Sequence, residues 1–292
     1  MIDDIFSVPS GRPARAAVFM SGSGTNAEAL LRYGSEHPDC GFVVALIVTD
    51  APESSRARAL SAQWGVPLVE HDIRAFYAAR GESAISLVSE RRRALRKEWT
   101  EELRRLLAPH TIDFGVLAGF VPLCNITADL PCLNVHPGDL TVEVDGRRIL
   151  AGLHFRPVES AILAGHNSLR SSVILAQSFE GNGEAEMDSG PVLGVSAPIP
   201  VDLEGESVET LAAVRAARTH APYRDRLREI AARNVERLKI GGDHVVLPRV
   251  VEDFAAGRFG LDGGGRLCFR EAGAWQPCRT VEYDGRRRRI LL

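Results

Sequence analysis

The sequence predicts a mixed α/β fold, and three observations support this prediction. Short apolar runs alternate with stretches of helical periodicity between residues 15 and 135, as in chains that form a parallel sheet covered by helices. The first apolar run, Ala16–Met20, opens directly into a small-residue loop and then a helical pattern. With 292 residues, the chain is long enough for a large α/β domain and an additional module. We therefore expect a Rossmann-like, mostly parallel sheet with helices on both faces, plus a small β-rich C-terminal extension.

The N-terminal part of the chain gives a clear alternation of elements. Apolar runs bounded by turn-forming residues predict strands, and apolar residues spaced three or four apart predict helices. On these grounds we expect strands at residues 15–20, 41–49 and 67–70, with helices at 25–36 and 54–65.

A long amphipathic helix is expected over Ile85–Leu107. Charged residues separate its apolar positions, which are Leu95, Trp99, Leu103 and Leu106. Buried strands follow at 112–117 and 130–135. Ligands of open α/β sheets gather at the carboxyl ends of the strands, so the loops after residues 20 and 135 are the expected binding regions.

The pattern changes after residue 137. We expect a hairpin at 141–150 around Asp145 and Gly146, a helix near 158–164 and strands at 171–178 and 191–199. One long charged helix is expected over about 208–238, ended by Gly241 and Gly242. The expected organisation is therefore an N-terminal extension at 1–14, a catalytic domain at 15–240 and a C-terminal extension of short strands at 241–292.

The loop after the first strand has the composition of an anion-binding site. Its small residues are Ser21, Gly22, Ser23, Gly24, Thr25 and Asn26. Glycine allows close backbone approach, and the N-terminus of the following helix offers free N–H groups and a positive dipole. Neither the GxGxxG pattern nor a P-loop is present, so a cradle for one phosphate fits best. The alternative is an ordinary turn in which Ser or Thr caps the helix.

Asn134 and His136 lie two residues apart at the end of an apolar run, and Asp188 follows in the segment MDSGPVL. Alternate side chains of a strand point to the same side, so the amide and the imidazole should share one space. An Asn amide and a protonated His can stabilise a tetrahedral oxyanion, while a carboxylate holds the imidazole charged and orders a relaying water. The alternative is a turn-capping Asn beside a buried structural His.

Four motifs in order resemble one known family. SGSGTN, VLAGF at Val116–Phe120, LNVHP at Leu133–Pro137 and DSGPVL at Asp188–Leu193 are similar to glycinamide ribonucleotide (GAR) formyltransferases of purine synthesis, within the folate-dependent formyltransferase superfamily. The resemblance implies the formyltransferase fold and 10-formyltetrahydrofolate as formyl donor.

The resemblance also assigns roles to residues of this chain. It implies that Asn134, His136 and Asp188 are catalytic. It places the acceptor phosphate at Gly22, Ser23, Gly24, Thr25 and Asn26. It places the folate at Leu117, Ala118, Gly119, Phe120, Val121 and Leu123.

The chain also departs from the family pattern. The family usually has Met-Arg where this chain has Val121 and Pro122, and Ser-Leu-Leu-Pro where it has Gly138–Thr141. Ile174 replaces a family His, the segment 180–187 is a Gly- and Glu-rich insertion, and His154 matches a family His. These changes leave the three catalytic positions intact and put the identity of the substrate in question.

Composition is that of an ordinary globular enzyme, with 45% hydrophobic and 25% charged residues and a net charge of -3. The charge argues against nucleic acid as the main partner. Five cysteines without CxxC spacing argue against a disulfide framework and a metal site. Without a long apolar run or a basic leader, we expect a cytoplasmic protein with small-molecule substrates and no membrane partner; a homodimer is compatible with the sequence.

Four functions remain open on the sequence. The first is formyl transfer to GAR or a similar phosphorylated amine, and the second is hydrolysis of formyltetrahydrofolate. Hydrolases of this kind usually carry an N-terminal regulatory domain and need no phosphate loop, whereas about fourteen residues precede the first strand here. The third is a formyltransferase for another amine, such as a sugar nucleotide or methionyl-tRNA. The fourth is a folate or nucleotide binder without activity, which has no chemical reason to keep all three catalytic residues.

Overall fold

The structure is a computed structural model that describes residues 2–153, 155–183, 186, 188–219, 223–285 and 287–292. Among these residues, the central sheet has nine strands in the spatial order β17, β16, β11, β10, β6, β5, β2, β3, β4. Their bounds are β2 Ala14–Met20, β3 Phe42–Thr49, β4 Leu68–Glu70, β5 Phe114–Leu117, β6 Cys132–His136, β10 Ser172–Leu175, β11 Val192–Ser196, β16 Thr280–Asp284 and β17 Arg287–Leu291. The five neighbouring strands β6, β5, β2, β3 and β4 all run parallel, whereas β10 is antiparallel to both of its neighbours, β6 and β11. The predicted α/β class with a mostly parallel sheet is confirmed.

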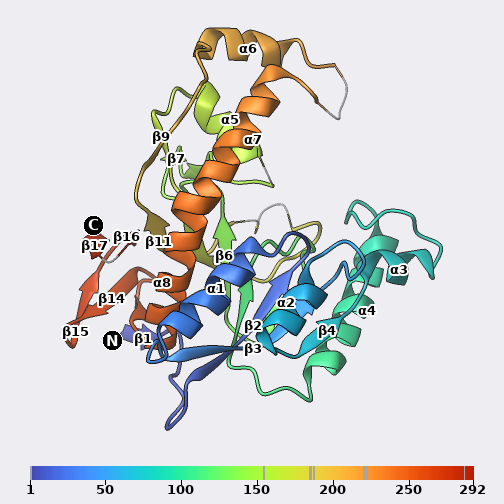
Figure 1. The fold of residues 1–292 in the computed structure, drawn as a ribbon, viewed down its shortest axis with the longest axis vertical. Coiled ribbons are helices and arrows are strands. Elements are labelled where there is room, and N and C mark those ends of the chain that lie inside the picture. Colours follow the sequence, from blue (N-terminus) through green and yellow to red (C-terminus); the bar gives the residue numbers. More distant parts are fainter. Residues whose placement is uncertain (1, 154, 184–185, 187, 220–222, 286) are drawn as a thin grey trace.

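Helices cover both faces of this sheet (Figure 1). One face packs against α1 (Thr25–Glu36), α2 (Ala57–Trp64) and α8 (His244–Ala255) in the largest core cluster. The other face packs against α3 (Ile73–Ala78), α4 (Glu90–Leu107) and a short 3₁₀ turn at Asn125–Ala128. In both layers, apolar side chains on one stripe of each helix meet the apolar face of the strands.

A third group of helices stands apart from these two layers. It contains α5 (Arg156–Leu163), α6 (Val208–Ala216) and α7 (Arg226–Leu238), which share their own core cluster. Figure 1 shows this group rising at one end of the sheet, with α7 running down toward α8. The two-stranded pairs β7 (Glu143–Val144) with β8 (Arg147–Arg148) and β9 (Ser168–Leu169) with β12 (Ile199–Pro200) complete this region.

The predicted helix at 208–238 is wrong, because α6 and α7 are separate helices. Each has its own N-cap: the Ser207 side chain accepts from the amide of Thr210, and the Asp225 side chain accepts from the amide of Arg228. A side-chain acceptor at such a position satisfies free N–H groups of a first turn and so starts a new helix. The sequence interpretation also missed α3, which the Asp72 side chain caps in the same way.

The chain does not leave the helix at Gly241 and Gly242. Instead, α7 widens into a π-helical turn at Lys239–Asp243 that continues into α8. The physical reason is close packing, because a Cβ on Gly242 would lie 2.5 Å from the Ser171 hydroxyl. The glycine therefore lets the helix approach β10 and does not end it.

The C-terminal strands are divided between two sheets. β16 pairs in parallel with β11 and extends the central sheet, whereas β13 (Phe259–Asp262), β14 (Leu267–Glu271) and β15 (Ala274–Pro277) form an antiparallel sheet with β1 (Ile2–Asp4). The expected boundary at 240/241 therefore does not coincide with a break in packing. In the described part of the chain, no helix is both long and apolar enough to cross a membrane.

Packing between β11 and the C-terminal elements yields a prediction about stability. A Cβ on Gly194 would lie 2.4 Å from Val250 of α8 and 2.7 Å from Tyr283 of β16. We expect Gly194→Ala to lower the free energy of unfolding by about 1–3 kcal/mol, because overpacking displaces both neighbours. Gly34→Ala, in open space on α1, should instead raise it by about 0.5–1 kcal/mol. Urea denaturation measures both, and equal effects would contradict this account of the packing.

Candidate active site

Asn134 and His136 lie at the carboxyl end of β6, in the middle of the central sheet. Asn134 pairs with Leu117 of β5 and Ile174 of β10, and His136 pairs with Ser172 of β10. Because the two residues are two positions apart, their side chains point to the same side of the sheet. Both line one cavity of about 390 Å³. The predicted shared space is therefore present.

Hydrogen bonds fix the tautomer of His136. Its Nε2 lies 2.7 Å from the carbonyl oxygen of Leu150, and its Nδ1 lies 3.4 Å from Oδ2 of Asp188. A carbonyl only accepts, so Nε2 must carry a hydrogen and Nδ1 is the nitrogen that gains or loses a proton. His136 is 3% exposed.

Asp188 reaches the site from a tight loop. It has a left-handed backbone, with φ of 57°, which Asp tolerates better than most residues. Its Oδ2 accepts a hydrogen bond of 3.0 Å from the amide of Gly152. The Arg148 guanidinium donates to the backbone carbonyls of Asp188 and Gly190. A Cβ on Gly190 would lie 1.7 Å from the Leu175 carbonyl oxygen, so the loop packs tightly on β10.

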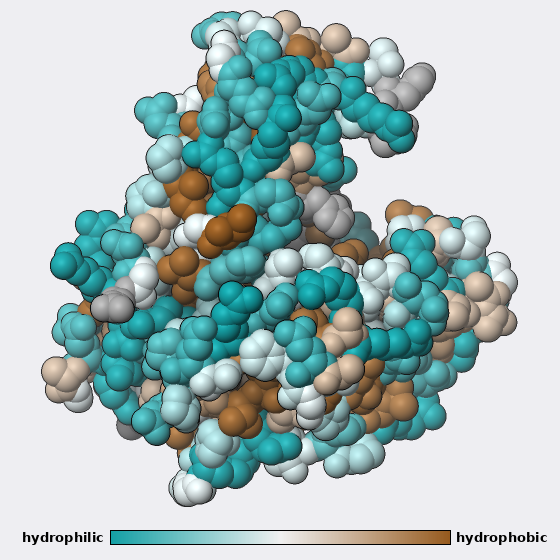
Figure 2. All heavy atoms as spheres, viewed as in Figure 1, coloured by the Kyte–Doolittle hydropathy of each residue, from teal (hydrophilic) through white to brown (hydrophobic). Residues whose placement is uncertain are grey.

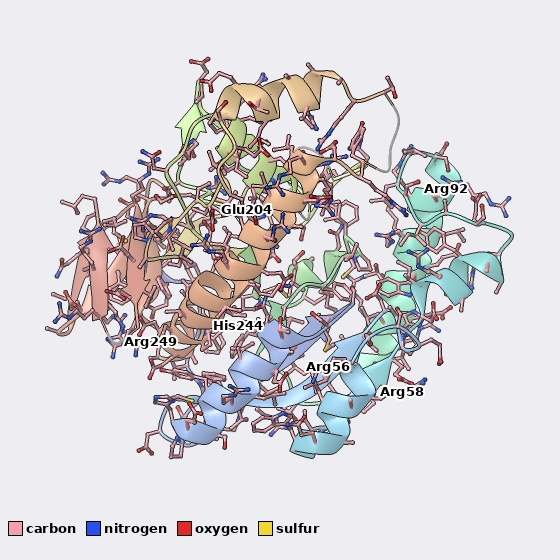
Figure 3. The ribbon with its side chains drawn as sticks, turned by 45° about the horizontal axis from the view of Figure 1, so that its top comes forward. Arg56, Arg58, Arg92, Glu204, His244 and Arg249 are labelled. Atoms are coloured by element: carbon pink, nitrogen blue, oxygen red, sulfur yellow. The ribbon has the colours of Figure 1, made fainter. Side chains whose placement is uncertain are left out.

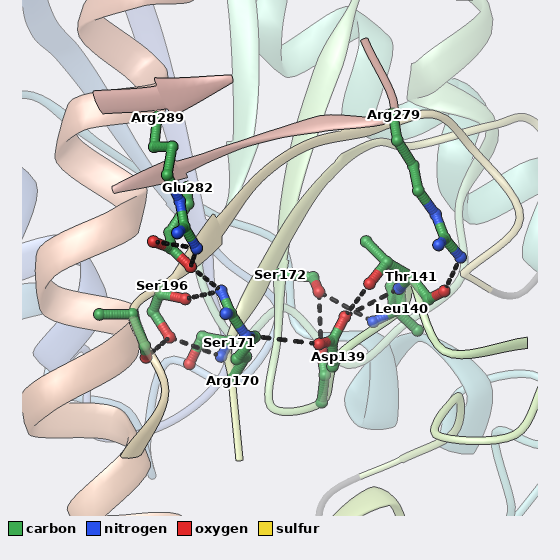
Figure 4. A network of polar contacts seen from close by, with 12 residues as sticks. Asp139, Leu140, Thr141, Arg170, Ser171, Ser172, Ser196, Arg279, Glu282 and Arg289 are labelled. Carbon is green, nitrogen blue, oxygen red and sulfur yellow. Dashed lines mark hydrogen bonds and ion pairs between the residues drawn. The ribbon is translucent and has the colours of Figure 1, made fainter. Parts of the chain in front are cut away.

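The loop after His136 is held by residues from distant strands (Figure 4). The Ser172 hydroxyl donates to the Gly138 carbonyl at 2.7 Å and accepts from the Leu140 amide at 3.0 Å. Arg170 lies 3.7 Å from Asp139 and 2.5 Å from Glu282 of β16. A Cβ on Gly138 would lie 2.6 Å from the Leu150 carbonyl. The glycine that departs from the family pattern thus makes room for the His136–Leu150 hydrogen bond.

Two cavities meet at these catalytic candidates. The cavity of about 390 Å³ extends from them toward α7 and the start of α1, and a second cavity of about 460 Å³ extends toward α4. Both are lined by Asn134 and Asp188, together with Phe120, Val121 and Leu153. Figure 2 shows the surface hollowed between the α6–α7 part and the part that carries α3 and α4. Two molecules, one in each cavity, can therefore meet beside Asn134.

The predicted folate residues are divided between these spaces. Those that line the larger cavity are Leu117, Phe120, Val121 and Leu123. Gly119 lines the smaller cavity, and the Ala118 side chain packs in the core beneath α1 and α8. Ile85–Val88, Arg96 and Phe179 also line the larger cavity and were missed. Arg96 could have been identified from the sequence, because a cation next to Leu95 and Trp99 on the apolar face of a helix is unusual.

The predicted phosphate loop lies at the start of α1. Gly24 precedes the helix with φ of 67° and no side-chain cap, so the alternative of a Ser or Thr cap does not apply. Arg56, labelled in Figure 3, donates to the Ser23 carbonyl at 3.3 Å. Gly22 and Ser23 are exposed, and Asn26 is the member that lines the smaller cavity.

Asn26 joins the loop to the junction between α7 and α8. Its Nδ2 donates to Asp243 at 3.1 Å, and the Ser171 hydroxyl donates to the other oxygen of the same carboxyl group. Burial raises the pKa of Asp243. Among the described residues, the buried Oδ1 of Asn26 has no hydrogen-bond partner, so it remains available to a ligand that donates.

The smaller cavity contains cationic residues that the sequence interpretation did not single out. Arg228 of α7 and Lys239 of the π-helical turn that follows it line this cavity together with Phe155. The sequence does not show that these positions face a cavity, so they could be identified only from the structure.

His154 and part of the 180–187 insertion lie outside the described residues. Within the described ranges, no group of three or more His, Cys, Asp or Glu is arranged to hold a metal ion.

Comparison with known proteins finds similarity to solved structures. No protein-family model matches the chain, and no curated protein sequence matches it. The phosphoribosylglycinamide formyltransferase of Anaplasma phagocytophilum is 20% identical, with a TM-score of 0.57 over 94% of this chain and 100% of that one. The corresponding enzyme of Coxiella burnetii is 18% identical, with a TM-score of 0.58 over the same shares.

A second activity occurs on the same fold. The formyltetrahydrofolate deformylase of Pseudomonas putida is 14% identical, with a TM-score of 0.52 over 90% of this chain and 72% of that one. At these identities the likeness establishes the fold alone, because one fold hosts different reactions. The chain therefore has the fold of the folate-dependent formyltransferase superfamily.

Proposed function

We propose that the chain transfers a formyl group from 10-formyltetrahydrofolate to the amine of a phosphorylated acceptor, with GAR as the first candidate. The observation that carries this proposal is that Asn134 and Asp188 line both cavities, with His136 beside Asp188 in the smaller one. A group transfer between two molecules needs such a junction, since holding both reactants together supplies much of the rate. With GAR as acceptor, the reaction belongs to purine biosynthesis.

The chemistry follows from the polar groups at the junction. The neutral amine of the acceptor attacks the formyl carbon, and a tetrahedral oxyanion forms. In the described part of the chain, the Asn134 side chain makes no hydrogen bond, so its amide is free to donate to that oxyanion. In the proposed step, a protonated His136, whose Nδ1 lies 3.4 Å from Oδ2 of Asp188, adds positive charge at the same place.

Collapse of the intermediate completes the transfer. The new C–N bond to the acceptor remains, the bond between the formyl carbon and N10 of the folate breaks, and N10 takes up a proton. The acceptor nitrogen loses a proton in the same step. Asp188 is positioned to order a water that carries the proton between the two nitrogens.

The two cavities suit the two proposed substrates. The larger cavity has an apolar lining that includes Phe120 and Leu123, and the flat pterin of a folate fits such a lining. The smaller cavity reaches Asn26 and the start of α1, where free N–H groups favour a phosphate. Hydrolysis of formyltetrahydrofolate is the second candidate, supported by the deformylase that shares the fold.

The deciding experiment is incubation of the purified protein with 10-formyltetrahydrofolate, with and without GAR. Loss of the formyl group that depends on GAR supports the transferase. Loss at the same rate without GAR identifies a hydrolase. No loss in either arm contradicts both enzymatic functions with these substrates.

The proposed role of Asp188 can be tested by Asp188→Asn. Asn tolerates the left-handed backbone, and the variant replaces the carboxylate beside Nδ1 of His136 by a neutral amide of the same size. We expect kcat to fall by about 100-fold or more, with a much smaller change in the acceptor KM. Asp145→Asn is the matched control, because Asp145 also has a left-handed backbone, with φ of 50°, but lies on the β7–β8 turn. Near-normal kcat in Asp188→Asn would exclude the role.

The phosphate loop can be tested by Gly22→Leu. A Cβ at Gly22 meets open space, so the fold should accept the side chain, which would obstruct an anion on the loop. We expect the acceptor KM to rise by about tenfold while kcat stays close to wild type. Gly34→Leu, on the same helix-loop segment and also in open space, is the control. An unchanged KM would show that the acceptor does not bind against this loop.

A further inference from the structure

One side of α7 forms a wall of the smaller cavity. The lining residues of this helix are Arg228, Ala232, Val235, Glu236 and Lys239. Their spacing of three and four positions places them on one face of the helix. At 1.5 Å per residue, Arg228 and Lys239 lie roughly 16 Å apart along the axis, so the wall has a cation at each end.

The cation at the Lys239 end already has a partner. Its Nζ lies 2.6 Å from Oε1 of Glu236. At this end the cavity also reaches Asn26 and Asp243, which bind each other. This is the end at which the phosphate of the proposed acceptor would lie.

Arg228, at the other end of this face, lines the same cavity as Asn134, His136 and Asp188. Its guanidinium lies over the ring of Phe155, three positions after Gly152, whose amide binds Asp188. Burial lowers the pKa of Arg228, but an arginine keeps its charge in proteins. A guanidinium stacked on a ring keeps its N–H edges free to donate sideways.

The carboxylates nearest to Arg228 are occupied by a different arginine. Arg218 binds Glu159 at 2.7 and 2.9 Å and Asp225 at 2.7 and 2.9 Å, with its side chain 5% exposed. The Arg228 side chain, in contrast, donates no hydrogen bond to any residue that the structure describes. Arg228 is therefore a cation that lines the cavity without an acceptor among the described residues, and its guanidinium can bind an anion from outside the chain.

We propose that Arg228 binds a second anionic group of the acceptor, a phosphate or carboxylate carried near the reacting amine. The planar fork of the guanidinium matches the two oxygens of such a group. The Asp188 carboxylate is not the anion that Arg228 binds, because the Gly152 amide and His136 already contact it. On this proposal the preferred acceptor is a phosphorylated amine that carries a second anionic group. GAR, whose only anionic group is its phosphate, would fill one end of the cavity and leave Arg228 without its anion.

This inference deepens the proposed function, and its test does not depend on activity. The full-length protein is titrated with inorganic phosphate and, separately, with succinate, by calorimetry at constant ionic strength. Wild type, Arg228→Met, Arg228→Lys and Phe155→Leu are compared, each also in the Gly22→Leu background, where binding at the phosphate loop is obstructed. Arg237→Met is the matched control, because Arg237 pairs with Asp202 on an exposed part of α7.

We expect Arg228→Met to weaken binding of at least one probe by about tenfold, and Arg228→Lys to weaken it less. Phe155→Leu should also weaken it, because the guanidinium loses the ring that holds it. A loss confined to phosphate or to succinate identifies which anion the site prefers. Three outcomes would each overturn the proposal. Both Arg228 variants could bind the probes with wild-type affinity, neither probe could bind to wild type, or Arg237→Met could lose as much affinity as Arg228→Met.

Formyl transfer measured in parallel separates this inference from the proposed function. Transfer to GAR that is unaffected by Arg228→Met, together with weakened anion binding, supports a second anionic group in the natural acceptor. Anion binding that depends on Arg228 without any formyl chemistry would leave the anion site standing and reject the transferase.

Discussion

The placement of a buried imidazole between a carbonyl and a carboxylate organises the whole site. His136 is almost fully buried, and its two ring nitrogens face Leu150 and Asp188, which come from different segments of the chain. Buried polar nitrogens are tolerated only when they have such partners. The β7–β8 hairpin positions Asp188, because its Arg148 binds the Asp188 loop. Gly138 positions the other partner, because it leaves room for the Leu150 carbonyl.

The C-terminal strands contribute to the same arrangement from a distance. β16 extends the central sheet beyond β11, and its Glu282 binds Arg170, which also lies beside Asp139. Arg279 donates to the Thr141 carbonyl in the same loop (Figure 4). The loop that follows His136 is therefore supported by charged groups from the last fifteen residues of the chain.

The helices α5, α6 and α7 determine the electrostatics of the acceptor side. Their own apolar core keeps them together without the sheet, and α7 then presents one face to the cavity. Arg218 neutralises Glu159 and Asp225 within this layer, which leaves Arg228 as the cation available at the reacting end. In the proposed reaction, the carboxyl end of the central strand β6 carries the chemistry, and the cavity-facing side of α7 carries the charge that the acceptor meets.

The sequence by itself determined the order of the strands from residue 14 to residue 136 and of the helices between them except α3, because apolar periodicity is a local property that the sheet only had to bury. The bounds of α1 agree with the predicted 25–36, and the i, i+2 spacing of Asn134 and His136 was enough to place them in one space. Tertiary structure alone decided the rest. The Asp225 cap separates α7 from α6. Close contact with Ser171 explains why the helix continues through Gly242. Pairing between distant strands divides the C-terminal strands between two sheets. Likewise, no local pattern reveals that Arg218 has taken the carboxylates beside Arg228, since pairing among charges is settled only when the helices pack.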